Sequence, residues 1–122
     1  MSRPDERGPP ERPSEPSAVP RRYRVDVTRT ADRDIAMVHA HIARDNRAAA
    51  AAWLDTVEQN IASLEQWPRR CPIIPEASEL QIEYRHLVDA PYRTIFRIAG
   101  SRVIIVRVIH GAQLLGLDIL ER

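Results

Sequence analysis

The spacing of apolar residues changes several times along the chain. Around residues 23–28 apolar and polar side chains alternate singly, with Tyr23, Val25 and Val27 apolar. A period of two is typical of a strand with one buried face. This alternation predicts a first strand.

Two helical patterns follow the predicted strand. Apolar residues then recur at spacings of three and four, which predicts a helix that Thr30 caps and that ends near Asn46. Asp32 and Asp34 fall in its predicted first turn, where the positive helix end favours acidic groups. A second helix is predicted from the alanines at 48–52 until Pro68, and the two helices are expected to form an antiparallel hairpin.

The last third of the chain has strand character. After a proline-punctuated loop, strand-like runs occupy 81–88, 92–99 and 102–110, with turn residues between them. The run 103–106 is apolar on both faces, which indicates a central strand. The order β-α-α-β-β-β predicts an α+β fold in which the helical hairpin packs on a small antiparallel sheet.

The first 21 residues differ in composition from the rest. They hold six of the ten prolines and almost no large apolar residue, which predicts a disordered tail, or a translation start closer to Tyr23. Residues 22–122 are then expected to form one domain. The chain has no apolar run suited to a signal peptide or a membrane span, and Cys71 is its only cysteine, so a cytoplasmic location is expected.

Charge narrows the range of partners. The chain has 18 basic and 17 acidic residues, so bulk charge gives no attraction to nucleic acid or membrane. All the basic residues are arginines, which suit bidentate contacts with phosphate or carboxylate, although a biased genome composition would produce the same pattern.

Three local stretches carry a family resemblance. They are TADRDI at 30–35, PYRTIFR at 91–97 and VRVIHGA at 106–112. Together with the predicted element order, they make the region from Tyr23 to about Leu117 similar to the RelE/ParE superfamily of toxins. The resemblance implies a toxin of a type II toxin-antitoxin system, held in a hetero-oligomer by a cognate ParD-like or RelB-like antitoxin, with no cofactor.

The same resemblance leaves two targets open. RelE-like members cut messenger RNA on the ribosome, commonly with lysines and a C-terminal tyrosine or histidine, whereas ParE-like members poison DNA gyrase. This chain has no lysine, and neither a tyrosine nor a basic residue directly follows His110-Gly111. We therefore expect a ParE-like gyrase inhibitor rather than an enzyme, with a ribosome-dependent endoribonuclease as the alternative and a non-toxic interaction module as a third reading.

Candidate target-binding residues lie on the predicted strands. Arg93, Arg97 and Arg107 with His110 are the expected target-binding group, and Arg85, Arg93, Arg107 and His110 would serve the endoribonuclease alternative as cations and an acid or base. The competing interpretation is a solvated or salt-bridged sheet face, with acids such as Glu83 as partners.

Other residues are expected to contact the antitoxin. These are Ile35, Val38, Ile42, Trp53, Leu114, Leu115 and Leu117. Trp53 and Trp67 flank the second helix and are expected to pack in the core or at an interface. Cys71 has no neighbouring base in the sequence that would make it a nucleophile. His39 and His41 lie two apart on a helix, about 200° around its axis, so they cannot chelate one ion together and no metal site is expected.

Overall fold

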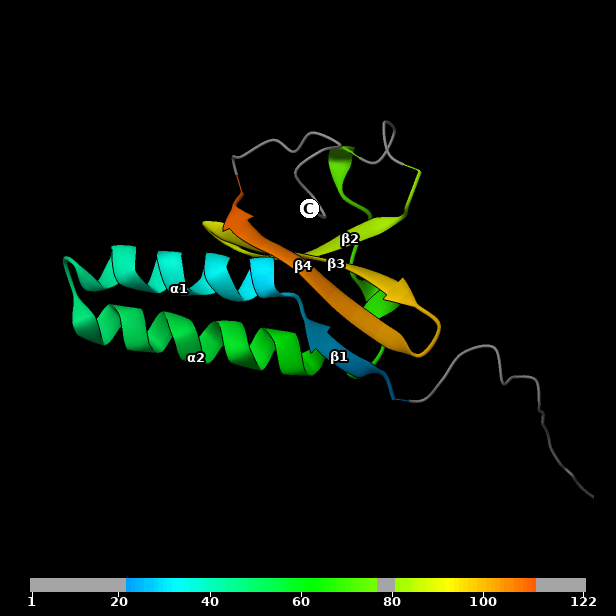
Figure 1. Cartoon of the computed structure of the whole chain (residues 1–122), viewed down its shortest axis with the longest axis horizontal. Helices are drawn as coiled ribbons and strands as arrows, with labels where there is room; N and C mark the ends of the chain where they lie inside the picture. Colours follow the sequence, from blue (N-terminus) through cyan, green and yellow to red (C-terminus); the bar gives the residue numbers. More distant parts are fainter. Residues whose placement is uncertain (1–21, 77–80, 112–122) are drawn as a thin grey trace, which may run out of the picture.

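The computed structural model describes residues 22–76 and 81–111. Its elements are β1 (Arg24–Val27), α1 (Arg29–Ala43), α2 (Arg47–Ser63), the short 3-10 helix η2 (Pro68–Arg70), β2 (Tyr84–Asp89), β3 (Tyr92–Ala99) and β4 (Arg102–His110). The two helices lie side by side and pack on a four-stranded sheet (Figure 1). The predicted order and α+β class are confirmed, while the predicted tail and Leu114, Leu115 and Leu117 lie outside the described residues.

The sheet has the strand order β1-β4-β3-β2. β2 with β3 and β3 with β4 form antiparallel hairpins, but β1 pairs with β4 in parallel, with Val25 opposite Val103. The prediction of an entirely antiparallel sheet is therefore wrong for this pair. The connection between β1 and β4 includes the helical hairpin and two strands, and a crossover of that length permits parallel pairing. β4 has a neighbour on each side, as its apolar run predicted.

The start of α1 differs from the prediction. Thr28, not Thr30, is the N-cap, and its Oγ1 accepts a hydrogen bond from the Ala31 amide at 3.1 Å. α1 ends at Ala43 rather than near Asn46, because Asn46 is in an extended conformation and caps α2 by accepting from the Ala49 amide at 2.9 Å. The turn between the two helices therefore comprises only residues 44–46.

The end of α2 is also earlier than predicted. The helix stops at Ser63, and the chain then turns so that the Glu65 carbonyl accepts from the Tyr23 amide at 2.8 Å. Trp67, immediately before Pro68, adopts a left-handed conformation with φ of 48°. A residue before proline is disfavoured in the right-handed helical region, so the helix cannot run up to Pro68.

The outer edge of β2 is partly covered by the segment 72–76. The Ile74 amide donates to the Tyr84 carbonyl at 3.0 Å, and the His86 amide donates to the Pro72 carbonyl at 3.1 Å. β2 begins at Tyr84 rather than at Gln81. The segment 72–76 therefore shields an edge whose amides would otherwise be unpaired.

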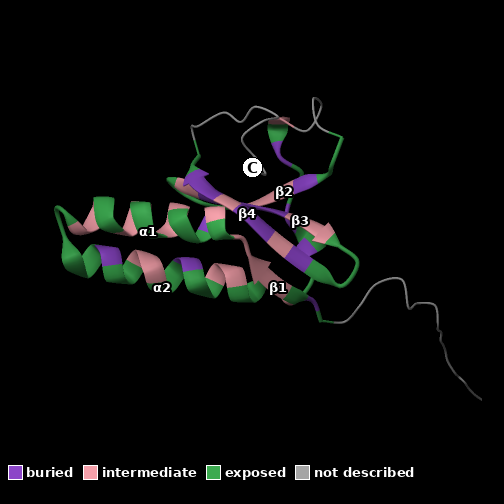
Figure 2. Ribbon diagram, in the orientation of Figure 1, coloured by how far each residue is buried: buried purple, intermediate pink, exposed green. Residues whose placement is uncertain are grey.

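Buried residues are concentrated in the central strands β3 and β4 (Figure 2). They form two clusters, one on each face of the sheet. The helix-side core joins β3 and β4 to both helices and includes Ala31, Val57, Leu64, Phe96, Val103, Ile105 and Val108. The second core, on the other face, comprises Ile74, Tyr84, Ile95, Val106 and Ile109. Phe96 pairs with Ile105 but Ile95 pairs with Arg107, so Val106 is an extra residue that forms a β-bulge.

Candidate functional site

Arg93 belongs to a buried ionic cluster on the second face of the sheet. Its Nη2 lies 2.6 Å from Glu76 Oε2, and its Nη1 lies 3.2 Å from Glu76 Oε1 and 3.2 Å from His86 Nδ1. Only 4% of its side chain is exposed. This two-pronged contact fastens the segment 72–76 to β3. Burial lowers the pKa of His86, and the neighbouring Arg93 lowers it further, although Glu76 acts in the opposite direction.

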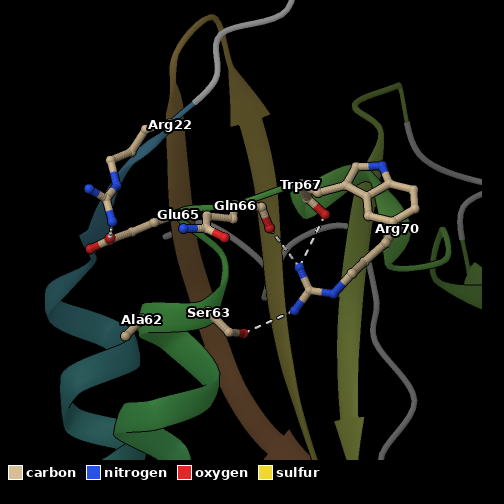
Figure 3. A pocket seen from close by; sticks show the side chains of 7 residues that line it. All are labelled: Arg22, Ala62, Ser63, Glu65, Gln66, Trp67 and Arg70. Atoms are coloured by element: carbon tan, nitrogen blue, oxygen red, sulfur yellow. Dashed lines mark hydrogen bonds and ion pairs between the residues drawn. The ribbon is translucent and has the colours of Figure 1, made fainter.

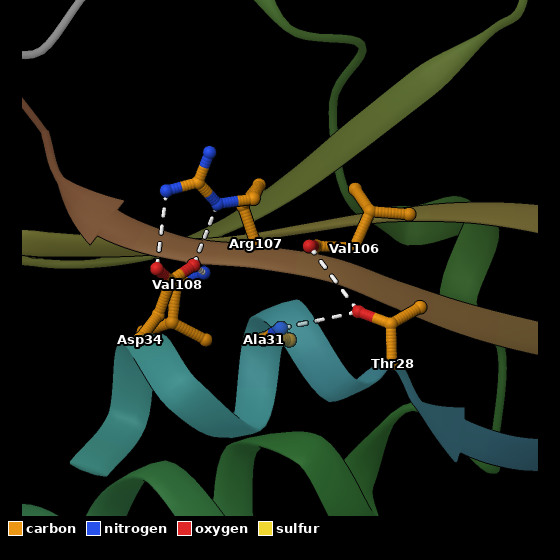
Figure 4. Close-up of polar contacts among 6 residues, drawn as sticks. All are labelled: Thr28, Ala31, Asp34, Val106, Arg107 and Val108. Carbon is orange, nitrogen blue, oxygen red and sulfur yellow. Dashed lines mark hydrogen bonds and ion pairs between the residues drawn. The ribbon is translucent and has the colours of Figure 1, made fainter. Parts of the chain in front are cut away.

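Arg107 is held by α1 at the open edge of β4 (Figure 4). β1 ends opposite Ile105, and beyond that point Thr28 Oγ1 donates to the Val106 carbonyl at 3.4 Å. Asp34 Oδ2 accepts from Arg107 Nε at 2.7 Å and from the Val108 amide at 3.0 Å. The sequence predicted Asp34 in the first turn of α1, but Asp34 lies beyond that turn. Its carboxylate binds the edge of the sheet instead.

Arg85 and Arg97 lie on opposite faces of the sheet. Arg85 pairs with the helix-side residue Phe96, and its Nη1 donates to the Cys71 carbonyl at 2.7 Å. Its Nη2 binds Glu83 at 3.1 Å, which agrees with the predicted salt-bridge alternative for Glu83. Arg97 is half-buried and pairs with Tyr84 and with Ile104, both of which pack in the second core. Arg93 and Arg107 pair with Ile109 and Ile95 of the second core, so Arg93, Arg97 and Arg107 all lie on the second face. Of the four strand arginines, only Arg85 lies on the helix side.

His110 belongs to a row of aromatic rings on the helix side. Its ring lies edge-on to Tyr92 at a centroid distance of 5.7 Å, and Tyr92 in turn lies edge-on to Trp53 at 5.6 Å. His110 is exposed and pairs with Tyr92, whereas Arg93 lies on the second face. The sequence placed these residues together as candidates, but the pleat of β3 directs them to opposite sides.

The hairpin residues expected to contact an antitoxin are half-buried. Ile35 and Trp53 pack against the helix-side core, while Val38 and Ile42 keep part of their surface exposed. These residues contribute to the fold and also leave apolar surface along the hairpin.

A pocket of about 570 Å³ lies at the C-terminal end of α2 (Figure 3). It is lined by Arg22, Ala62, Ser63, Glu65, Gln66, Trp67 and Arg70. Arg22 pairs with Glu65 at 3.4 Å across it, and Trp67 is 73% exposed at its rim. Of the two tryptophans, Trp53 packs on the core, while Trp67 does not.

Cys71 is buried close to this region. Burial raises the pKa of its thiol, and the nearby Arg70 and Arg85 only partly oppose that effect. A protonated, buried thiol is a poor nucleophile.

Within residues 22–76 and 81–111, no three His, Cys, Asp or Glu side chains gather into a group that could hold a metal ion. In the same part of the chain no helix has the length and apolar character needed to cross a membrane.

Several residues of these sites were not predicted from the sequence. Glu76 and His86 complete the Arg93 cluster, and Asp34 binds Arg107, yet the members of each pair lie 7 to 73 positions apart. Spacing along the chain gives no signal for such pairs. For Trp67, the one sequence signal was its position directly before Pro68, because a proline disfavours the helical conformation of the residue that precedes it.

Comparison with known proteins shows which protein family this sequence matches. Residues 25–115 match the family described as the ParE toxin of the type II toxin-antitoxin system parDE. No curated protein sequence matches the chain.

Two solved structures match the chain in the structural comparison. The chromosomal ParDE toxin-antitoxin system from P. aeruginosa aligns with a TM-score of 0.62 at 19% identity, over 75% of this chain and 98% of the other. A chain of the toxin-antitoxin complex RelBE2 from Mycobacterium tuberculosis aligns with a TM-score of 0.48 at 27% identity, over 73% of this chain and 98% of the other. The ParDE likeness agrees with the sheet and hairpin described above.

Proposed function

Because this chain belongs to the ParE toxin family of type II toxin-antitoxin systems, we propose that it arrests growth by poisoning DNA gyrase and that a cognate antitoxin neutralises it. The toxin acts by binding, without a catalytic step of its own.

The observation that carries the choice of target is the engagement of the candidate catalytic arginines. RNA cleavage needs cations that can reach a phosphate in the transition state. Arg85, Arg93 and Arg107 instead bind the Cys71 carbonyl, Glu76 and Asp34, and their side chains are 16%, 4% and 17% exposed. Moving any of them to a substrate would break contacts that fasten the loop or α1 to the sheet.

The position of His110 supports the same choice. Its ring stacks edge-on with Tyr92 on the helix side, and Arg93 lies on the other face of the sheet. An acid or base must lie within hydrogen-bond reach of the group it serves, near the cations that hold the phosphate. The chain also has no lysine to take the place of these arginines.

The antitoxin surface we propose follows the helical hairpin. Val38, Ile42 and the exposed parts of Ile35 and Trp53 form a half-buried apolar strip that a partner helix or strand can cover. Leu114, Leu115 and Leu117 extend this proposal beyond the described residues.

The test is a DNA gyrase supercoiling assay with purified full-length chain, in which trapped cleavage complexes are scored on the same gel. Inhibition that the antitoxin relieves is the expected result. Relaxation by topoisomerase I under the same conditions is the control, because a toxin that acted by coating DNA would slow both enzymes.

Ribosome-dependent cleavage is tested in parallel with a translating extract and a defined messenger RNA. Unaffected gyrase together with messenger cleavage that His110→Ala abolishes would replace the proposal with the endoribonuclease alternative. Unaffected gyrase and intact messenger would leave only an interaction module.

A further inference from the structure

Trp67 combines two unfavourable features in one residue. It adopts a left-handed backbone conformation with φ of 48°, and its side chain is 73% exposed to solvent. Left-handed geometry suits glycine and is a clear outlier for a bulky side chain. Exposure of the indole adds a second cost, because the apolar ring stays in water. The position before Pro68 accounts for the loss of the right-handed helical conformation, but it does not account for a bulky, exposed indole at a left-handed residue.

Arg70 fixes the backbone that presents the indole. Its Nη1 donates to the Gln66 carbonyl at 2.8 Å and to the Trp67 carbonyl at 3.1 Å, and its Nη2 donates to Ser63 Oγ at 3.0 Å (Figure 3). These bonds satisfy two carbonyls just beyond the end of α2 and hold residue 67 in place. The backbone that carries the indole is therefore fixed at the rim of the pocket rather than left on a loose loop.

The surroundings of the indole are basic and partly apolar. Arg22 and Arg70 line the pocket with one acid, Glu65, and the exposed Arg69 follows two residues after Trp67. Three arginines and one carboxylate give this surface, which we define as Arg22, Glu65, Trp67, Arg69 and Arg70, a positive charge. Tryptophan and arginine are the residues most enriched among binding hot spots.

We infer that this Trp67 surface is where the toxin engages its protein target, an acidic surface that inserts an apolar side chain beside the indole. The inference rests on the proposed function, in which that target is gyrase. A partner carboxylate would complement the positive charge, and the pocket of about 570 Å³ has room for a side chain.

A protein fits this surface better than a nucleic acid does. Arg70 is committed to the end of α2 and Arg22 is paired with Glu65, so two of the three guanidinium groups are already engaged. Binding a DNA backbone requires several phosphate contacts made by available cations. The chain as a whole carries a formal charge of only +1.

The surface is also separate from the strip proposed for the antitoxin. Trp67 follows the C-terminal end of α2, whereas Val38 and Ile42 lie toward the hairpin turn at Asn46. The two partners can therefore be distinguished by substitution.

The experiment compares the full-length wild type with Trp67→Gly, Trp67→Phe and the control Met37→Ala. Glycine removes the indole and tolerates the left-handed backbone, so Trp67→Gly is expected to melt at the same or a higher temperature than the wild type. Met37 is a matched control because it is also a large apolar residue, 66% exposed, outside both proposed surfaces.

The readouts are gyrase supercoiling, antitoxin affinity and binding to a duplex DNA oligonucleotide. We expect Trp67→Gly to need about tenfold or more toxin for half-inhibition of gyrase, and Trp67→Phe about threefold or less. Met37→Ala should match the wild type, and antitoxin affinity should be unchanged in every variant.

The inference is overturned if Trp67→Gly inhibits gyrase as well as the wild type does, or if it weakens antitoxin or DNA binding by the same factor as gyrase inhibition. Failure of the wild type itself to inhibit gyrase would overturn the proposed function and, with it, this assignment of the target.

Discussion

Asp34 on α1 and Arg107 on β4 are joined at the open edge of the sheet, 73 residues apart in the sequence. One carboxylate oxygen of Asp34 accepts both the Arg107 Nε proton and the Val108 amide. The contact thus combines an ion pair with the pairing of an edge amide that β1 is too short to reach. It also sets the position of α1 against the sheet.

Removal of the Asp34 carboxylate should therefore destabilise the fold. Asp34→Ala removes the carboxylate that accepts from a guanidinium and an amide in a largely buried place, since the two side chains are 12% and 17% exposed. We expect the free energy of unfolding to fall by about 2–4 kcal/mol, measured by urea denaturation. Asp32→Ala is the control in the same helix, because Asp32 is exposed in the first turn and contributes only about 0.3–1 kcal/mol through the helix dipole. Equal effects of the two substitutions would contradict this account.

The N-cap of α1 gives a second prediction. Thr28→Ala removes the acceptor for the Ala31 amide and should lower the free energy of unfolding by about 1 kcal/mol. Thr30 lies inside the helix, where alanine is the better helix former, so Thr30→Ala should be neutral or slightly stabilising. Thermal melts of the two variants check this order, and a larger loss from Thr30→Ala would show that the cap is assigned to the wrong residue.

The local elements could be predicted because their signals lie within a few residues. β3 and β4 have the predicted bounds, since each strand is an apolar-rich run with turn residues on either side. The sequence could not distinguish Thr28 from Thr30 as the N-cap of α1, because threonine is a favourable N-cap residue at either position. Only the backbone hydrogen bonds show which of the two is the cap.

The nonlocal relationships could not be predicted in the same way. Parallel pairing of β1 with β4 depends on how a long crossover returns to the sheet, which no short pattern encodes. Arg93 was expected at a target surface from its residue type and strand position. Its burial depends on its ion pair with Glu76. Glu76 lies in a loop whose prolines were its only recognisable sequence feature.

The Arg93 cluster gives a third prediction. Glu76→Gln replaces the carboxylate that receives both guanidinium prongs by a neutral group and removes the negative charge that faces the buried Arg93 guanidinium. We expect the free energy of unfolding to fall by about 2–4 kcal/mol in urea denaturation. Glu83→Gln is the control, because the Glu83 side chain is 55% exposed in its pair with Arg85, and its substitution should change stability by less than about 1 kcal/mol.

Toxicity assays of Arg93 variants must take the stability of this cluster into account. Arg93→Ala should lower thermal stability together with activity, whereas loss of activity at unchanged stability would mean that Arg93 acts directly on a target. The melting temperature must therefore be measured beside each toxicity assay of this variant.

His86 makes the stability of the cluster depend on pH. Burial and Arg93 lower its pKa in the folded protein below the ordinary value of 6.5, while Glu76 opposes them. Between the folded and the unfolded pKa the unfolded chain binds more protons, so acidification favours unfolding. The contribution of neutral His86 is present above about pH 6.5 and is lost as the pH falls below that value.

His86→Gln keeps a polar side chain at this place but cannot titrate. The free energy of unfolding of the wild type should therefore fall more steeply between about pH 7.5 and pH 5.5 than that of His86→Gln, in parallel urea titrations at each pH. His39, His41 and His110 are present in both proteins, so they do not contribute to the difference between the two slopes. A variant whose stability fell as steeply as that of the wild type would mean that protonation of His86 does not weaken the attachment of the segment 72–76.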